Sequence, residues 1–396
     1  METVRGCRIL CFLVIFATHF AECRGVWWTA GGPLMLQPRR ICRKVHAIGG
    51  ELQKSICRRD RHLLKEIVKG VEIGMDECQY QLRYHRWNCT TRRRSLGKML
   101  LRDTKEAAFV HATTASAVAH VVANACGKGR LKSCTCHQTR RYRAADGRWF
   151  WGGCGDNFDF GYQKSLEFMD FGSEPAKDIR ANILRHNNEV GRLTIKNQMT
   201  VKCKCHGLSA SCELKTCWPK MPPFRQTGDV LLFKFKAAKP VTPDNSPAGS
   251  FLWVEEMGTA YRERKAANKR NGVDDGQSQD DEAMDLDDSD ASSSSATALS
   301  HLHRRSAVQE EVLVYTDSSP NLCKTNRKMG ILGTRGRLCN GTTSSESSGS
   351  CDYLCCGRGY VAEVATVEAN CRCRFQWCCE VICERCVFNK SSHYCS

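Results

Sequence analysis

Apolar residues recur at helical spacing in the N-terminal half of the chain. Leu63, Leu64, Ile67, Val68 and Val71 fall on one face of a helix. Such a face must be buried against other elements, so the pattern predicts a helix that packs into a bundle.

Two further helices are predicted along the same half. The stretch after Asp103 is apolar on all sides, which indicates a capped and largely buried helix. Its apolar residues are Ala107, Ala108, Val110, Ala115, Ala117, Val118, Val121 and Val122. A third helix is predicted from Asp178 through His186, with its end near Gly191.

Other segments favour strands and turns. The Cys-Lys-Cys run and the Trp/Gly-rich segment Trp149–Cys154 interrupt the helical pattern. The segment Cys339–Cys395 is too rich in cysteine and too poor in apolar runs to fold by burial alone. The predicted fold class is therefore α+β and disulfide-rich. It combines an N-terminal helical bundle that carries disulfide-stapled β-hairpins with a small C-terminal β domain that resembles a cysteine knot.

The N-terminus has the pattern of a secretory signal peptide. Arg5 and Arg8 precede the apolar run Ile9–Ala17, and Ala21 and Cys23 are small residues suited to a cleavage site. Residues 1–23 are expected to be removed, and the protein to pass through the endoplasmic reticulum and Golgi to the extracellular space and matrix. No later stretch of the sequence is long and apolar enough to predict a transmembrane helix.

The chain has 27 cysteines, of which three lie in this leader. The remaining 24 fall into two equal groups, which indicates two domains that each close their own disulfides in an oxidising compartment. The first group is Cys42, Cys57, Cys78, Cys89, Cys126, Cys134, Cys136, Cys154, Cys203, Cys205, Cys212 and Cys217. The second group is Cys323, Cys339, Cys351, Cys355, Cys356, Cys371, Cys373, Cys378, Cys379, Cys383, Cys386 and Cys395.

The composition changes between the two groups. The segment Asp274–Asp290 holds nine acidic residues and no base, and a serine run follows it. Such a stretch cannot bury a core, and we expect it to be disordered and dispensable for folding. The net charge is +17, so the rest of the chain carries about +26. We expect residues 24–235 to form an N-terminal helical domain, residues 236–311 a linker, and residues 312–396 a C-terminal cysteine-rich domain.

The sequence KCKCHGLSASCELKTCW contains four cysteines at nested spacing. If Cys205 pairs with Cys212 and Cys203 with Cys217, the bridges isolate a six-residue tip, His206–Ser211. A structural hairpin with a solvated serine is the simplest interpretation. A zinc site made from Cys203, Cys205, His206 and Cys212 would need an unusual Cys-x-Cys spacing. A hydrolase nucleophile here would lack the closing glycine of its motif.

A second nested set lies near the C-terminus. Pairing of Cys371 with Cys386 and of Cys373 with Cys383 leaves five residues at the tip of a loop. They are Phe375, Gln376, Trp377, Cys378 and Cys379. Aromatic residues on a stapled loop suggest a binding finger, although a lone tryptophan is more commonly buried in a local core.

Three Asn-x-Ser/Thr sequons predict N-glycosylation of a secreted chain. They begin at Asn88, Asn340 and Asn389.

Several motifs together resemble the Wnt family of secreted morphogens. Besides the two cysteine-rich segments they are RWNC, WGGCGDNFDFG, GTRGRLCN and CDYLCCGRGY. The resemblance covers nearly the whole mature chain, and Trp27, Trp28 and the segment Gly31–Leu34 are most similar to the sixth Wnt subclass.

The resemblance implies a ligand, not an enzyme, that activates Wnt signalling in development by binding the cysteine-rich domain of Frizzled receptors. Ser211 matches the serine that Porcupine acylates with palmitoleate. The first hairpin would be a receptor-binding thumb whose contact residues are His206, Gly207, Leu208, Ser209 and Ser211. The second loop would be an index finger that binds through Phe375, Gln376, Trp377, Cys378 and Cys379. Lipoprotein-receptor-related co-receptors, the carrier Wntless and heparan sulfate proteoglycans are the other expected partners; no metal, other cofactor or nucleic acid is expected.

The resemblance also implies disulfides outside the two hairpins. These are Cys78–Cys89, Cys126–Cys134, Cys136–Cys154, Cys323–Cys356, Cys339–Cys351, Cys355–Cys395 and Cys378–Cys379. Cys42 and Cys57 remain and could pair with each other.

One departure from the family and one competing function bear on this interpretation. The family usually has glycine where this chain has Ala210, and a methyl group at a position with positive φ costs about 1 kcal/mol. The competing class is a matrix or heparin-binding protein without receptor agonism, whose cell-surface binding would be released entirely by high salt.

Overall fold

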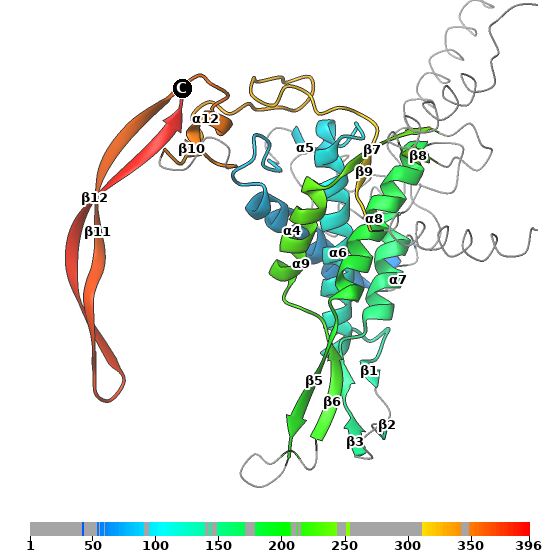
Figure 1. Ribbon diagram of the computed structural model, residues 1–396. Helices are drawn as coiled ribbons and strands as arrows, with labels where there is room; N and C mark the ends of the chain where they lie inside the picture. The colour runs from blue at the N-terminus through cyan, green and yellow to red at the C-terminus, as the bar shows by residue number, and fades with distance from the viewer. Residues whose placement is uncertain are drawn as a thin grey trace, which may run out of the picture. The chain divides into compact units, whose positions relative to one another are not determined.

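The computed structural model describes residues 42, 54, 56–58, 60–90, 95–138, 142–143, 149–170, 179–206, 212, 215–243, 251–253, 311–341 and 348–396 (Figure 1). The predicted leader and the acidic segment Asp274–Asp290 lie outside these residues. The chain divides into two units. We call Met1–Cys78 with Leu100–Ser318 the helical unit, and Gln79–Met99 with Ser319–Ser396 the cystine-rich unit.

The helical unit is organised around one buried helix. Helix α6 (Lys105–Gly127) packs against α7 (Phe158–Met169), α8 (Ile179–Asn197) and α9 (Phe224–Lys236). Every α6 residue from Glu106 to Ala119 is buried, as the all-round apolar pattern predicts. The hydroxyl of Thr104 accepts a hydrogen bond from the N–H of Ala107, so the helix is capped one residue later than Asp103.

Small residues allow the neighbouring helices to approach α6 closely. A Cβ atom at Gly191 of α8 would lie 2.1 Å from the carbonyl oxygen of Ala112, and one at Gly161 of α7 would lie 2.3 Å from that of Ala119. Glycines of α4 (Arg61–Gln81) meet the same helix at Thr114 and Val118. The prediction that α8 ends near Gly191 is wrong: this glycine lies inside the helix and serves close packing.

Three small sheets complete the described part of the helical unit. Strands β2 (Tyr142–Arg143), β3 (Trp149–Gly152), β6 (Lys215–Lys220) and β5 (Thr200–Cys205) form a sheet in the order β2-β3-β6-β5, in which only β3 and β6 are parallel. Strands β1 (His137–Gln138) and β4 (Cys154–Gly155) pair antiparallel. The third sheet has the order β8-β7-β9, with bounds β7 (Lys239–Pro243), β8 (Phe251–Trp253) and β9 (Val314–Tyr315).

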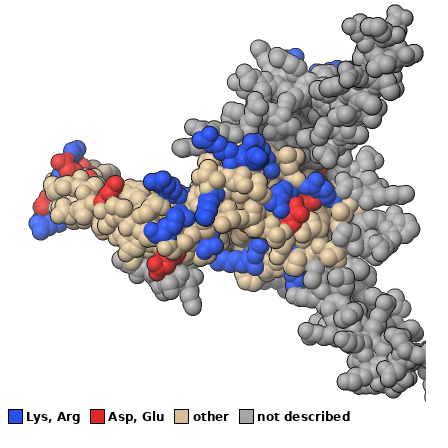
Figure 2. All heavy atoms as spheres, turned by 90° about the horizontal axis from the view of Figure 1, so that it is seen from above, with Lys and Arg blue, Asp and Glu red and all other residues tan. Residues whose placement is uncertain are grey.

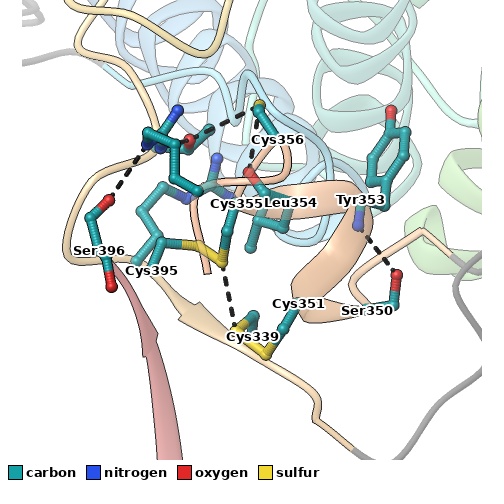
Figure 3. Close-up of a disulfide and its surroundings, with 12 residues drawn as sticks. Cys339, Ser350, Cys351, Tyr353, Leu354, Cys355, Cys356, Cys395 and Ser396 are labelled. Carbon is teal, nitrogen blue, oxygen red and sulfur yellow. Dashed lines mark hydrogen bonds between the residues drawn. A yellow bond between two sulfur atoms is a disulfide. The ribbon is translucent and has the colours of Figure 1, made fainter. Parts of the chain in front are cut away.

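The cystine-rich unit has a core made largely of sulfur. Its buried cluster consists of Cys339, Cys351, Leu354, Cys355 and Cys395. Within it the disulfides Cys339–Cys351 and Cys355–Cys395 approach each other, with two of their sulfur atoms 3.6 Å apart (Figure 3). The short helices α5 (Ser95–Met99) and α12 (Cys351–Leu354) belong to this unit, as do strands β10 (Leu338–Cys339), β11 (Tyr360–Gln376) and β12 (Glu380–Cys395).

The sequence partition did not anticipate that Gln79–Met99 joins the C-terminal residues. Arg337 explains the association, because its guanidinium donates to the carbonyl oxygens of Arg83, His85 and Arg86 at 2.7–2.8 Å. The Arg86 guanidinium in turn lies over the Tyr353 ring, 4.4 Å from its centroid. Such long-range contacts leave no periodic signal in the sequence.

The disulfides follow the expected pairing with one exception. The structure contains Cys42–Cys57, Cys126–Cys134, Cys136–Cys154, Cys203–Cys217, Cys205–Cys212, Cys323–Cys356, Cys339–Cys351, Cys355–Cys395, Cys371–Cys386 and Cys373–Cys383. Cys78 and Cys89 are both disulfide-bonded. The exception is the pair Cys378 and Cys379, whose thiols are free and exposed.

The expected Cys378–Cys379 bond is therefore wrong for this structure. Consecutive Cα atoms across a trans peptide are about 3.8 Å apart, closer than the ~4.4–6.8 Å that disulfides usually span. The described residues contain no cis peptide bond. Both cysteines have positive φ, 76° and 82°, which serves the turn that they form.

Candidate functional site

The first candidate site is the hairpin of β5 and β6, which we call the thumb hairpin (Figure 1). Cys203 lies directly opposite Cys217 in the register, and their disulfide joins the two strands. The second bridge, Cys205–Cys212, lies nearer the tip, so the nested pairing is as predicted. Because these thiols are used in disulfides, they are not available to bind zinc.

A buried carboxylate fixes the root of the thumb hairpin. Asp156 is 5% exposed and accepts hydrogen bonds from the Met221 backbone N–H at 3.1 Å and the Asn124 side chain of α6 at 3.3 Å. The Lys220 ammonium lies 3.0 Å from the same carboxylate. Nearby, a ring nitrogen of His120 lies 2.9 Å from the Pro222 carbonyl oxygen, and burial lowers the pKa of His120. The last residues of β6 are thus held against the helical bundle.

Neighbouring strands support the hairpin laterally. Strand β3 pairs with β6 through Trp151 and Gly152. Gly153 lies against the side chains of Thr216 and Trp218, where a Cβ atom would come within 3.0–3.3 Å of them.

The tip of the thumb hairpin lies mostly outside the described residues. Gly207, Leu208, Ser209, Ala210 and Ser211 are not among them. His206 is described and exposed, and its Nε2 lies 2.9 Å from the Thr216 hydroxyl oxygen on β6. This contact joins the two strands immediately below the predicted lipidation loop.

The second candidate site is the hairpin of β11 and β12, which we call the finger hairpin (Figure 1). The strands pair antiparallel from Tyr360 opposite Cys395 to Gln376 opposite Glu380, with a register shift between Cys371 and Arg374. The disulfides Cys371–Cys386 and Cys373–Cys383 cross the ribbon at this irregularity, in the predicted nested arrangement. Arg372, within the irregularity, has a φ of 46°.

The end of the finger hairpin presents apolar side chains to solvent. Residues 377–379 form the turn, in which Trp377 is 91% exposed; Phe375 is 71% exposed on the preceding strand. The structure therefore places Trp377 outside any local core. Val381 lies opposite Phe375 and is 60% exposed. We did not single out Val381 from the sequence, although counting strand residues outward from the nested bridges would have paired it with Phe375.

The three sequons lie in different surroundings. Asn88 is half-buried next to the disulfide-bonded Cys89, whereas Asn340 and Asn389 are exposed. Asn389 lies on β12 opposite Thr366. Glycosylation at these positions stays a prediction.

Comparison with known proteins gives one consistent result. The model of the wnt family matches residues 48–396. The chain belongs to the Wnt family. Mouse Wnt-6 is 37% identical over 397 residues, which cover 95% of each chain. Human Wnt-6 is 36% identical over 409 residues, which cover 98% of this chain and 97% of the human one. These relatives are consistent with the resemblance to the sixth Wnt subclass.

A solved structure supports the fold. WNT8A, in a structure of human WLS in complex with WNT8A, matches with a TM-score of 0.55 and 28% identity, over 85% of this chain and 95% of that one. Wnt proteins are signalling ligands and not enzymes, so this chain is a signalling ligand of the Wnt type. Within the described residues, no helix combines the length and apolar character needed to cross a membrane.

Proposed function

We propose that this Wnt protein is secreted with palmitoleate on Ser211 and binds the cysteine-rich domain of Frizzled receptors through the thumb and finger hairpins. The observation that carries the proposal is the exposure of Trp377, 91%, at the end of a hairpin fixed by two disulfides. A folded protein rarely leaves such an apolar group in water unless a partner covers it.

The acyl chain supplies the second contact. Burial of a sixteen-carbon chain contributes roughly 0.8 kcal/mol per methylene, or on the order of 10 kcal/mol before ordering costs. The bridge Cys205–Cys212 and the His206–Thr216 contact hold the ends of the loop that contains Ser211. A stapled loop loses little entropy when a receptor groove orders it.

The expected partners follow from this chemistry. Porcupine would attach the acyl chain, and Wntless would shield it during secretion; the likeness to WNT8A, solved in complex with human WLS, supports the carrier. Lipoprotein-receptor-related co-receptors would complete the signalling complex. The positive net charge of +17 favours retention in the extracellular matrix by heparan sulfate proteoglycans.

The decisive experiment replaces Trp377 with alanine. We expect normal secretion, because Trp377 contributes nothing to a core, and a loss of Frizzled affinity of about 2 kcal/mol or more. Binding of the secreted variant to an immobilised Frizzled cysteine-rich domain is the measurement. Phe233→Ala is the control, because Phe233 is an exposed aromatic residue on α9 outside both hairpins. Retention of Trp377→Ala in the cell, or unchanged affinity, would contradict the proposal.

Salt separates this function from matrix binding alone. A lipid-inserted ligand keeps its receptor affinity when salt screens the surface charges, whereas a purely electrostatic matrix protein is released. Complete release of the protein from Frizzled-expressing cells by high salt would favour the matrix function.

A further inference from the structure

A hollow of about 620 Å³ lies beside the base of the finger hairpin, far along the strands from its tip and within the cystine-rich unit. Its volume falls within the range of pockets that hold small ligands, ~300–1,000 Å³. Lys390–His393 of β12, Leu338–Asn340, Ser348, Gly349 and Tyr84 line it. Strand pairing between β10 and β12 fixes two of its sides, because Cys339 lies opposite His393.

The lining combines an aromatic ring with hydrogen-bonding groups and a cation. Tyr84 is 45% exposed, and Ser391, Ser392 and Asn340 offer hydroxyl and amide groups. Lys390 adds a positive charge, and no Asp or Glu is among the lining residues that the structure describes. An aromatic face surrounded by hydroxyl and amide groups suits a sugar ring, and a cation without a carboxylate suits an anionic substituent.

Further positive charge lies beside Tyr84. The Arg83 guanidinium is 4.0 Å from the centroid of the Tyr80 ring and 4.6 Å from that of Tyr84. Stacking on two rings and a hydrogen bond to the Tyr80 carbonyl hold this cation in place. In the described part of the cystine-rich unit, ion pairs join Arg372 to Glu384 and Arg385 to Glu368, both on the finger hairpin. None of the carboxylates in the described residues therefore forms an ion pair with Arg83.

The neighbouring Arg337 also forms no ion pair with a carboxylate among the residues that the structure describes. Its guanidinium donates to backbone carbonyls, and burial lowers its pKa. Figure 2 shows that basic side chains are spread over the face seen from above, while acidic ones gather in fewer places. Within the described residues, the cations of Lys390 in the lining and of Arg83 beside Tyr84 thus favour an anionic ligand over a neutral one in the hollow.

We propose that this hollow is a binding subsite for a sulfated polysaccharide, with a sugar ring against Tyr84 and sulfate groups on Arg83 and Lys390. The inference deepens the matrix-retention part of the proposed function by giving it a place on the chain. The polysaccharide subsite does not involve the acyl group or the tips of the two hairpins. Either proposal, polysaccharide binding or Frizzled binding, can therefore fail while the other stands.

The experiment measures binding of the secreted full-length protein to a heparin octasaccharide and to its chemically desulfated form. Lys390→Gln, which keeps the Asn389 sequon, is expected to lower the affinity for the sulfated form about fivefold and to reduce its salt dependence. Lys132→Gln is the matched control, because Lys132 is an exposed lysine of the helical unit. Equal losses from Lys390→Gln and Lys132→Gln would overturn the proposal, since net charge alone would explain them.

A second pair of variants tests the aromatic contact. Tyr84→Ser removes the ring and is expected to lower affinity about fivefold without changing the salt dependence, whereas Tyr84→Phe keeps the ring and should bind normally. Unchanged binding by correctly secreted Tyr84→Ser would overturn the assignment.

Treatment with an N-glycosidase forms the last arm, because Asn340 lines the same hollow. We expect the effects of Tyr84→Ser and Lys390→Gln to be the same before and after treatment. Effects that emerge only after treatment would mean that the chain's own glycan occupies the hollow, which would refute the subsite in the glycosylated protein.

Discussion

Met221 donates its backbone N–H to Oδ2 of Asp156 across 3.1 Å, which ties the chain leaving the thumb hairpin to the loop before α7. The two residues are 65 positions apart in the sequence. This buried carboxylate therefore contributes directly to the position of the thumb hairpin on the helical bundle.

We expect Asp156→Ala to destabilise the helical unit by about 2–4 kcal/mol, because it leaves a buried N–H and the amide of Asn124 without their acceptor. Asp156→Asn keeps an acceptor and should cost less. Denaturant unfolding of the two variants is the measurement. Asp159→Ala, at an exposed position in the first turn of α7, is the control and should cost less than about 1 kcal/mol. Equal stability of Asp156→Ala and Asp159→Ala would contradict this account.

His111 predicts a pH dependence of stability. It is buried in α6, and burial lowers its pKa to about 4. The unfolded chain, with a histidine pKa near 6.5, therefore binds more protons than the folded one between about pH 6.5 and pH 4. Stability is fully present above pH 6.5 and falls as the pH is lowered through this window, by an amount on the order of 3 kcal/mol.

Thermal unfolding between pH 7 and pH 4 measures this effect. His111→Leu should lose stability less steeply on acidification, whereas His137→Gln, which changes an exposed histidine, should keep the wild-type slope. Parallel pH profiles for wild type and His111→Leu would show that His111 is not responsible.

Cys378 and Cys379 should react as free thiols in the native protein, since both are exposed. Alkylation with iodoacetamide without reductant is expected to modify both, while Cys371, Cys373, Cys383 and Cys386 stay protected in their disulfides. Mass spectrometry of the fingertip peptide distinguishes the outcomes. Modification of Cys378 and Cys379 only after reduction would contradict this prediction. It would show that the two residues form the vicinal disulfide that the family resemblance implies.

Ser211, and not Ser209, is predicted to carry the acyl chain. Ser211→Ala should abolish labelling by an alkynyl fatty acid, transfer to the carrier and Frizzled signalling, while Ser209→Ala should only weaken them. Metabolic labelling and a Frizzled reporter assay on matched amounts of protein are the measurements. Full labelling of Ser211→Ala would refute the assignment, and loss of labelling only in Ser209→Ala would move the site.

Deletion of residues 271–298 should leave secretion intact, because the segment contains no cysteine and no periodic pattern of apolar residues that could form a core. The deletion removes nine acidic residues and no base, so heparin should retain the shortened protein to higher salt. A neutral Gly/Ser linker of equal length is the control for chain connectivity and should behave like the deletion. Failure of secretion in both variants would show that the segment is needed for folding.

The sequence predicted the parts of this molecule that depend on local pattern. Helix α6 follows from its all-round apolar pattern, and the nested bridges of both hairpins follow from cysteine spacing. The other parts of the fold depend on contacts between residues that are far apart in the sequence. Gly191 resembled a helix terminus because the sequence does not reveal that Ala112 packs against it. Likewise, only the folded chain brings Arg337 to the carbonyl groups after α4.

The sulfur core of the cystine-rich unit also sets the order in which the chain can mature. Cys395 closes the bridge to Cys355, and Gln79–Met99 belongs to the same unit. During synthesis the early segment Gln79–Met99 must therefore wait for Cys395 before all of its native partners exist. Oxidative folding of this unit can finish only after Cys395 has been synthesised and has reached Cys355.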